Sequence, residues 1–193
     1  MSIVVGVSGP TGAGKSALAR ALLAELGDAQ PLYMDDYERM TREPLDKVAR
    51  WAERGADFDE LPLPGLAEDL RRLKQESPAR YVVFETQFGR AHRATGALID
   101  FSIWIDVPLE VALARKVKDF TAAALAEAPA RARERLQWLD GYVAGYLGLV
   151  RRLLVIQSEK VRPRADLVVD GGEDPASLAR LAGAALRRRL EHA

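Results

Sequence analysis

The residues best suited to chemistry in this chain are Gly9 to Ser16, which read Gly-Pro-Thr-Gly-Ala-Gly-Lys-Ser. They match the pattern G-x-x-x-x-G-K-[ST] at every fixed position. The glycines allow the backbone to curl until successive N–H groups point inward and form a cradle for an anion. Lys15 can then reach the β- and γ-phosphates of a nucleotide, and the Ser16 hydroxyl can bind Mg²⁺. The predicted nucleotide contacts are Gly9, Thr11, Gly12, Ala13, Gly14, Lys15, Ser16 and Ala17.

The flanks of this segment are those that a phosphate cradle needs. An apolar run, Ile3 to Val7, precedes it and is typical of a strand buried on both faces of a parallel sheet. After it, apolar residues recur at helical spacing from Ala17 to Leu26, and Gly27 stands where helices commonly end. The N-terminus of that helix would add partial positive charge at the phosphates.

The rest of the chain alternates between apolar runs and helical patterns. Strands are predicted at residues 31–34, 81–85, 101–107 and 165–170, and helices begin near residues 45, 64, 108 and 174. Residues 122–156 are predicted to be largely helical, with interruptions near Pro129, Gly141, Gly145 and Gly148. This alternation predicts an α/β fold, a doubly wound parallel sheet of five strands with helices on both faces, in a single domain over residues 1–193. Trp51, Trp104 and Trp138 are expected to pack in the interior.

Carboxylates follow two of the predicted strands. Asp35, Asp36 and Tyr37 come after the second strand, and Glu85 ends the third. Because the carboxyl ends of parallel strands meet at one edge of a sheet, we expect these side chains to face the Gly9 loop. A predicted basic loop at residues 89–96 would reach the same edge. Its candidates for binding a second substrate are Arg90, His92 and Arg93, and Asp36 and Tyr37 are candidates for the same role.

Composition narrows the function classes. The 193 residues include 28 Lys and Arg against 28 Asp and Glu, so no net charge would attract nucleic acid or an anionic membrane. There is no cysteine, which excludes disulfides, a thiolate nucleophile and cysteine-based zinc sites. Residues 141–150, the longest apolar stretch, are too few to span a bilayer. Since Met1 leads directly into the first strand, we expect a cytoplasmic protein without a signal peptide.

Absent motifs separate the classes of phosphate-loop protein. The sequence has no asparagine, so the guanine-reading N-K-x-D motif of GTPases cannot exist, and D-x-x-G is missing as well. The chain is also short for a motor ATPase with its sensor elements. What remains is a small phosphotransferase, in which Mg²⁺, a lysine and mobile basic residues stabilise the phosphoryl group in transfer.

Together the motifs resemble the uridine kinase, nicotinamide riboside kinase and phosphoribulokinase family. The residues that carry the resemblance are Gly9–Ser16, Asp35-Asp36-Tyr37, Asp57-Phe58-Asp59, Val82–Glu85 and Ala165–Asp170. The resemblance implies a fold of the P-loop nucleoside triphosphate hydrolase type, a helical lid around residues 115–130, and ATP and Mg²⁺ as cofactors. It also implies roles for five residues. Asp35 would activate a substrate hydroxyl, and Asp35 and Glu85 would join Ser16 at the metal. Asp59 would hold ribose hydroxyls, and Arg115 and Lys116 would close over the phosphates as lid cations.

Two departures leave the second substrate open. Thr86 follows Glu85 where the family usually has glycine, and the lid pattern is one residue short at residues 115–119. The acceptor is therefore predicted to be a nucleoside or ribosyl compound, with a nucleoside monophosphate or an alcohol such as pantothenate as alternatives. A non-catalytic ATP-binding module is a third possibility. Either Asp35 or Asp36 could be the base, and Asp36 would otherwise orient the water ligands of Mg²⁺. The sequence also leaves open whether ATP or GTP is the donor and whether the protein is a monomer or a homo-oligomer.

Overall fold

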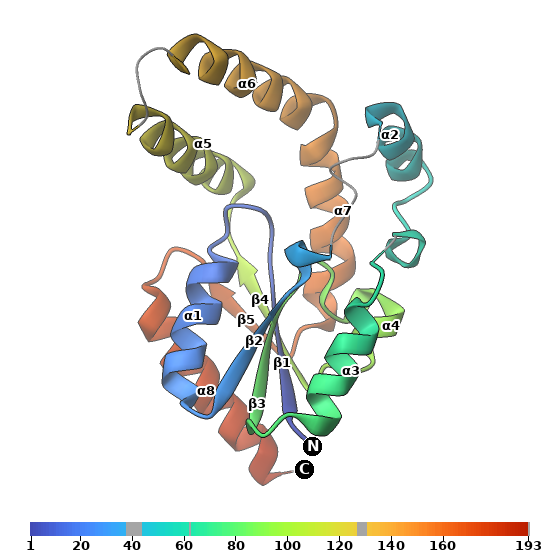
Figure 1. Ribbon diagram of the computed structural model, residues 1–193, viewed down its shortest axis with the longest axis vertical. Coiled ribbons are helices and arrows are strands. Elements are labelled where there is room, and N and C mark those ends of the chain that lie inside the picture. Colours follow the sequence, from blue (N-terminus) through green and yellow to red (C-terminus); the bar gives the residue numbers. More distant parts are fainter. Residues whose placement is uncertain (38–43, 62, 127–130, 193) are drawn as a thin grey trace.

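The computed structural model describes residues 1–37, 44–61, 63–126 and 131–192 (Figure 1). Its centre is one parallel sheet in the order β2-β3-β1-β4-β5. The strands are β1 (Ile3–Ser8), β2 (Ala29–Tyr33), β3 (Tyr81–Glu85), β4 (Phe101–Asp106) and β5 (Leu167–Asp170). The strand order reverses beside β1, and ligands of such sheets bind at this switch point. The predicted doubly wound fold is therefore confirmed.

Helices cover both faces of the sheet, because successive strand residues point to opposite sides. Val5 and Val7 of β1 face α1 (Lys15–Leu26) and α8 (Pro175–Glu191). Val4, which precedes Val5 in the strand, faces the opposite side and belongs to a second core. The helices that contribute to this second core are α2 (Leu45–Glu53), α3 (Leu66–Glu76) and α7 (Arg151–Val161). Both faces are thus apolar and closed, and the carboxyl ends of the strands are left for polar groups.

Two helices pack against each other beyond the carboxyl ends of the strands, and both termini lie at the opposite end of the molecule (Figure 1). They are α5 (Leu109–Leu125) and α6 (Ala132–Gly145), which we call the lid arm. Trp138 of α6 stacks on Phe120 of α5 with ring centroids 4.3 Å apart, and Tyr142 stacks on Trp138 at 5.3 Å. Trp138 is 48% exposed, so its predicted burial is wrong, whereas Trp51 and Trp104 are buried.

Some predicted boundaries are corrected by the structure. Met34 leaves β2 and begins a 3₁₀ turn, Met34–Asp36, which the bond from Tyr37 N to Met34 O closes. Residues 89–96 are not an open loop but a 3₁₀ turn, Gly89–Ala91, followed by α4 (Arg93–Gly96).

The glycines of the lid arm do not break it. Helix α6 runs through Gly141 and Gly145, and only a wider π-helical turn, Tyr146–Val150, separates it from α7. The interruption predicted near Pro129 lies outside the described residues. None of the helices in the described ranges combines the length and apolar character that crossing a bilayer requires.

Candidate active site

The phosphate loop joins β1 to α1, and two of its glycines have backbone angles that other residues rarely adopt. Gly12 has φ 80° and Gly14 has φ 96°. At Gly12 an added Cβ would lie 2.2 Å from the carbonyl oxygen of Ala112 in α5, so the loop also touches the base of the lid arm directly. The positive φ values at Gly12 and Gly14 give the turned backbone that an anion cradle requires.

The polar side chains expected at this loop do converge. Ser16 Oγ donates to Glu85 Oε1 at 3.0 Å, and Lys15 Nζ donates to the carbonyl of Pro10 at 3.2 Å. Burial lowers the pKa of Lys15, while the carboxylates of Glu85 and Asp35 oppose this shift and Lys116 adds to it. Because these electrostatic effects require proximity, the structure brings together groups from α1, the turn after β2, β3 and α5.

Asp35 is exposed on the turn after β2, with a neighbour that the sequence did not indicate. Gln87 Nε2 donates to Asp35 Oδ1 at 3.3 Å, and Gln87 N contacts the sulfur of Met34 at 3.5 Å. Gln87, in the segment after β3, therefore contacts both Met34 and Asp35 in the turn after β2. Asp36 is exposed on the same turn.

The remaining residue of this group, Tyr37, turns to helix α3. Its hydroxyl donates to Asp69 Oδ2 at 2.7 Å, a bond that raises the pKa of Tyr37 to about 12. Contact of its hydroxyl with a second substrate would therefore have to compete with Asp69.

Asp59 and Arg93 form a pair near this site. Arg93 donates to Asp59 through its backbone N at 2.7 Å and its side-chain Nε at 2.8 Å, and these bonds lower the pKa of Asp59. Phe58 stacks on Phe88 with ring centroids 4.4 Å apart, which places the Asp59 turn against the segment after β3. Asp59 and Arg93, both predicted to bind a second substrate, thus lie beside the segment that carries Gln87.

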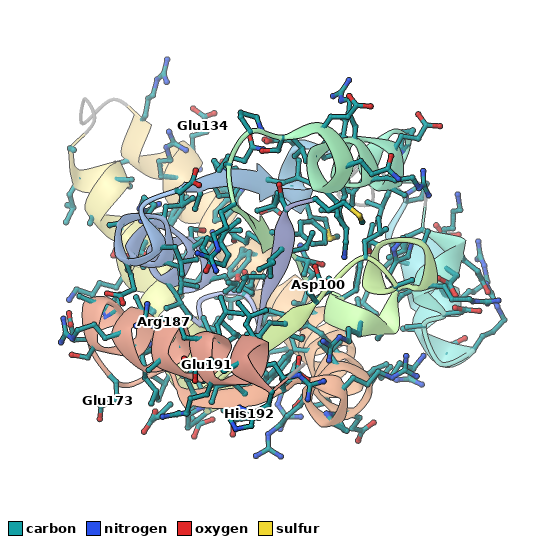
Figure 2. The ribbon with its side chains drawn as sticks, turned by 90° about the horizontal axis from the view of Figure 1, so that it is seen from below. Asp100, Glu134, Glu173, Arg187, Glu191 and His192 are labelled. Atoms are coloured by element: carbon teal, nitrogen blue, oxygen red, sulfur yellow. The ribbon has the colours of Figure 1, made fainter. Side chains whose placement is uncertain are left out.

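Arg90 and His92 have partners within the protein. Arg90 Nη2 lies 2.7 Å from Asp166 and 2.9 Å from the carbonyl of Asp100, and these residues precede β5 and β4. Asp100 lies at the amino-terminal edge of the sheet, which Figure 2 shows from below. The Arg90 guanidinium therefore binds at the edge of the sheet opposite to the phosphate loop.

His92 is buried. Its Nδ1 is 2.8 Å from Thr95 Oγ1, so the ring contributes to packing rather than to an open site.

The two lid cations occupy different places. Lys116 is exposed and close enough to Lys15 to lower its pKa. Arg115 instead donates through Nη1 to the carbonyl of Gly171 at 2.8 Å, in the connection between β5 and α8. A cavity lies beside the phosphate loop there, and its lining includes Gly14, Leu18, Arg115, Gly171 and Pro175. Arg115 is thus positioned to the side of the cradle rather than over it.

Sequence patterns missed Gln87 and Gln157. Gln87 carries no motif, and only the fold brings it to Asp35. Gln157 could have been noticed in the sequence, since it occupies the buried stripe of α7 together with Leu154 and Val161. A polar residue at an apolar position of a helix is a usable signal.

Comparison with known proteins agrees with this architecture. No model of a known protein family matches the sequence. Among solved structures, a possible uridine kinase from Bacillus stearothermophilus is 18% identical, with 88% of this chain and 89% of that chain covered and a TM-score of 0.57. Shikimate kinase from Aquifex aeolicus is 16% identical over 99% of this chain and 100% of that chain, with a TM-score of 0.53. A sugar kinase from Janibacter sp. is 16% identical over 97% and 95%, with a TM-score of 0.51.

This chain has the fold of P-loop kinases. At identities this low the likeness concerns the fold, and the acceptor has to be argued from the site itself.

Proposed function

We propose that the protein is an ATP- and Mg²⁺-dependent kinase that transfers a phosphoryl group to a hydroxyl of a small metabolite, a nucleoside or another ribosyl compound. The observation that supports this best is the contact from Ser16 to Glu85, with the carboxylate of Asp35 near enough to Lys15 to act on its pKa. A binding module would need the cradle but not a carboxylate facing it. The arrangement therefore favours catalysis over binding alone.

The donor side has the parts that a nucleoside triphosphate needs. The cradle and Lys15 would bind the β- and γ-phosphates, and the cavity lined by Arg115, Gly171 and Pro175 would take the base. The Ser16 hydroxyl and Glu85 carboxylate are hard oxygen donors that suit Mg²⁺, which commonly takes its other ligands from water and phosphates. When bound there, Mg²⁺ would neutralise charge that develops on the phosphates.

The acceptor side would use Asp35. Its carboxylate would take the proton of the acceptor hydroxyl as that oxygen bonds to the γ-phosphorus and the bond to the ADP oxygen breaks. Lys15 and Lys116 would stabilise the transferred group. Asp59, held by Arg93, would accept hydrogen bonds from further hydroxyls, which suits a ribosyl compound. Arg90 is occupied at the opposite edge, and this weakens the case for a phosphorylated acceptor.

The test is Asp35→Asn, with the neighbouring Asp36→Asn as matched control. ADP release is measured with a panel of nucleosides, nucleoside monophosphates and other alcohols, and ATP binding is measured separately. We expect Asp35→Asn to lower turnover by about 10²–10⁴-fold, the usual contribution of a general base, while ATP binding persists.

Unchanged turnover in Asp35→Asn would remove Asp35 from the mechanism, and loss confined to Asp36→Asn would transfer the role to Asp36. ATP binding without a phosphorylated product from any acceptor would favour a binding module.

A further inference from the structure

Gln157 is a buried polar side chain that no nucleotide-binding pattern includes. It lies in the middle of α7, is 5% exposed, and shares its buried stripe with Leu154 and Val161. Helix α7 is separated from α6 of the lid arm only by the π-helical turn, and Figure 1 shows the chain passing from one helix into the other. Gln157 thus lies where the lid arm enters the body of the protein.

The amide of Gln157 donates to two backbone carbonyls that belong to different loops. Nε2 lies 2.6 Å from the carbonyl oxygen of Gln87, in the segment after β3, and 3.3 Å from that of Gly9, the first fixed glycine of the phosphate loop. Gln87 in turn donates through its own side chain to Asp35. One amide group therefore connects the phosphate cradle with the segment that holds the proposed base.

The two carbonyls determine which end of the Gln157 amide faces them. The other orientation of the amide would place an oxygen 2.6 Å from the Gln87 carbonyl, where two acceptors repel each other, so the two carbonyls fix the orientation shown. Among the described residues, Oε1 is a buried side-chain acceptor without a hydrogen-bond partner. The side chain is consequently held through its NH₂ group alone, and replacement of that group would release both loops from α7.

We propose that Gln157 is a positioning residue that fixes the distance between the phosphate loop and the Asp35 segment and links both to the lid arm. The proposal rests on the proposed kinase function, because that distance matters when a hydroxyl held at Asp35 must meet a phosphate held at the cradle. Displacements of about 1 Å can lower a rate by 10²-fold even when both substrates still bind. Loss of Gln157 therefore affects turnover more than binding.

The first experiment compares Gln157→Met with Gln137→Met, a matched change at an exposed glutamine of α6. Methionine has a similar length but cannot donate. We expect Gln157→Met to lower kcat by about 10–100-fold with little change in KM for ATP or acceptor, and Gln137→Met to behave as the wild type. If kcat per folded molecule is unchanged in Gln157→Met, Gln157 is merely structural and the proposal fails.

The second experiment does not depend on turnover. Amide hydrogen exchange is measured with and without Mg²⁺ and a non-hydrolysable ATP analogue. In the wild type the analogue should slow exchange in residues 9–16 and also in residues 86–91, whereas in Gln157→Met it should slow only the first segment. Protection of both segments in Gln157→Met would overturn the proposal.

The two experiments separate the proposals. A wild-type protein that phosphorylates no acceptor would refute the kinase function, while hydrogen exchange would still decide the coupling. If Gln157→Met does not fold, Gln157→Asn serves instead, because its shorter side chain keeps the amide but cannot reach both carbonyls.

Discussion

Alanine substitutions at Gly12 and Gly14 should have unequal effects on stability, although both residues have positive φ. A non-glycine residue in the left-handed region costs about 1–2 kcal/mol, and this applies to both positions. At Gly14 an added Cβ meets nothing within 4 Å. At Gly12 it would lie 2.2 Å from Ala112 O and 2.8 Å from Ala112 C, and both atoms belong to helix backbone that no rotamer change can move.

The size of the difference follows from this contact. Carbon atoms pack at about 3.5–4.0 Å, so α5 would have to shift by about 1 Å, and overpacking of this kind costs about 1–3 kcal/mol. We therefore expect Gly14→Ala to lose about 1–2 kcal/mol and Gly12→Ala about 2–5 kcal/mol. For a chain of this size these losses correspond to falls in Tm of about 2–8 °C and about 4–20 °C.

The assay is thermal unfolding of both variants, together with urea unfolding to obtain the free energies. The direct contact between the phosphate loop and α5 is refuted if the two variants lose equal stability. It is also refuted if Gly14→Ala loses more, because only Gly12 faces the backbone of Ala112.

Two further predictions concern His92 and Arg115. Burial lowers the pKa of His92, so the unfolded chain binds a proton at higher pH than the folded protein. The free energy of unfolding should therefore fall as pH drops below about 6.5. Urea unfolding at several pH values should show a weaker fall in His92→Asn. Identical pH profiles of the two proteins would contradict this. Arg115→Met should weaken ATP binding by about 2–30-fold, the effect of losing a cation beside an aromatic base. Lys118→Met, on the exposed side of α5, should leave ATP binding unchanged. Calorimetric titration gives both affinities, and an unchanged affinity in Arg115→Met would place the base elsewhere.

The sequence was sufficient for the fold because the strands are apolar and the phosphate-loop pattern is strict. The Ile3–Val7 run, the glycines and the helix after Lys15 each follow from local rules that agree with one another. The same rules predicted that Asp35 and Glu85 would reach one edge of the sheet, since Asp35 follows one parallel strand and Glu85 ends another.

Other residues of the site could not be assigned in this way. Arg90 and Arg93 are three positions apart in a basic segment, yet a turn followed by a short helix directs one to Asp166 and the other to Asp59. The partners of Gln157 lie 70 and 148 positions away in the chain. Such contacts depend on how helices pack on the sheet, which local pattern does not encode.

The stacked rings of the lid arm give the protein an intrinsic optical probe. Of its three indoles, Trp51 and Trp104 are enclosed by the core, and Trp138 is half exposed between Phe120 and Tyr142. A collisional quencher dissolved in the buffer would reach Trp138 first, so quenchable emission originates mainly from α6. Movement of that helix can therefore be followed by fluorescence in the unlabelled protein.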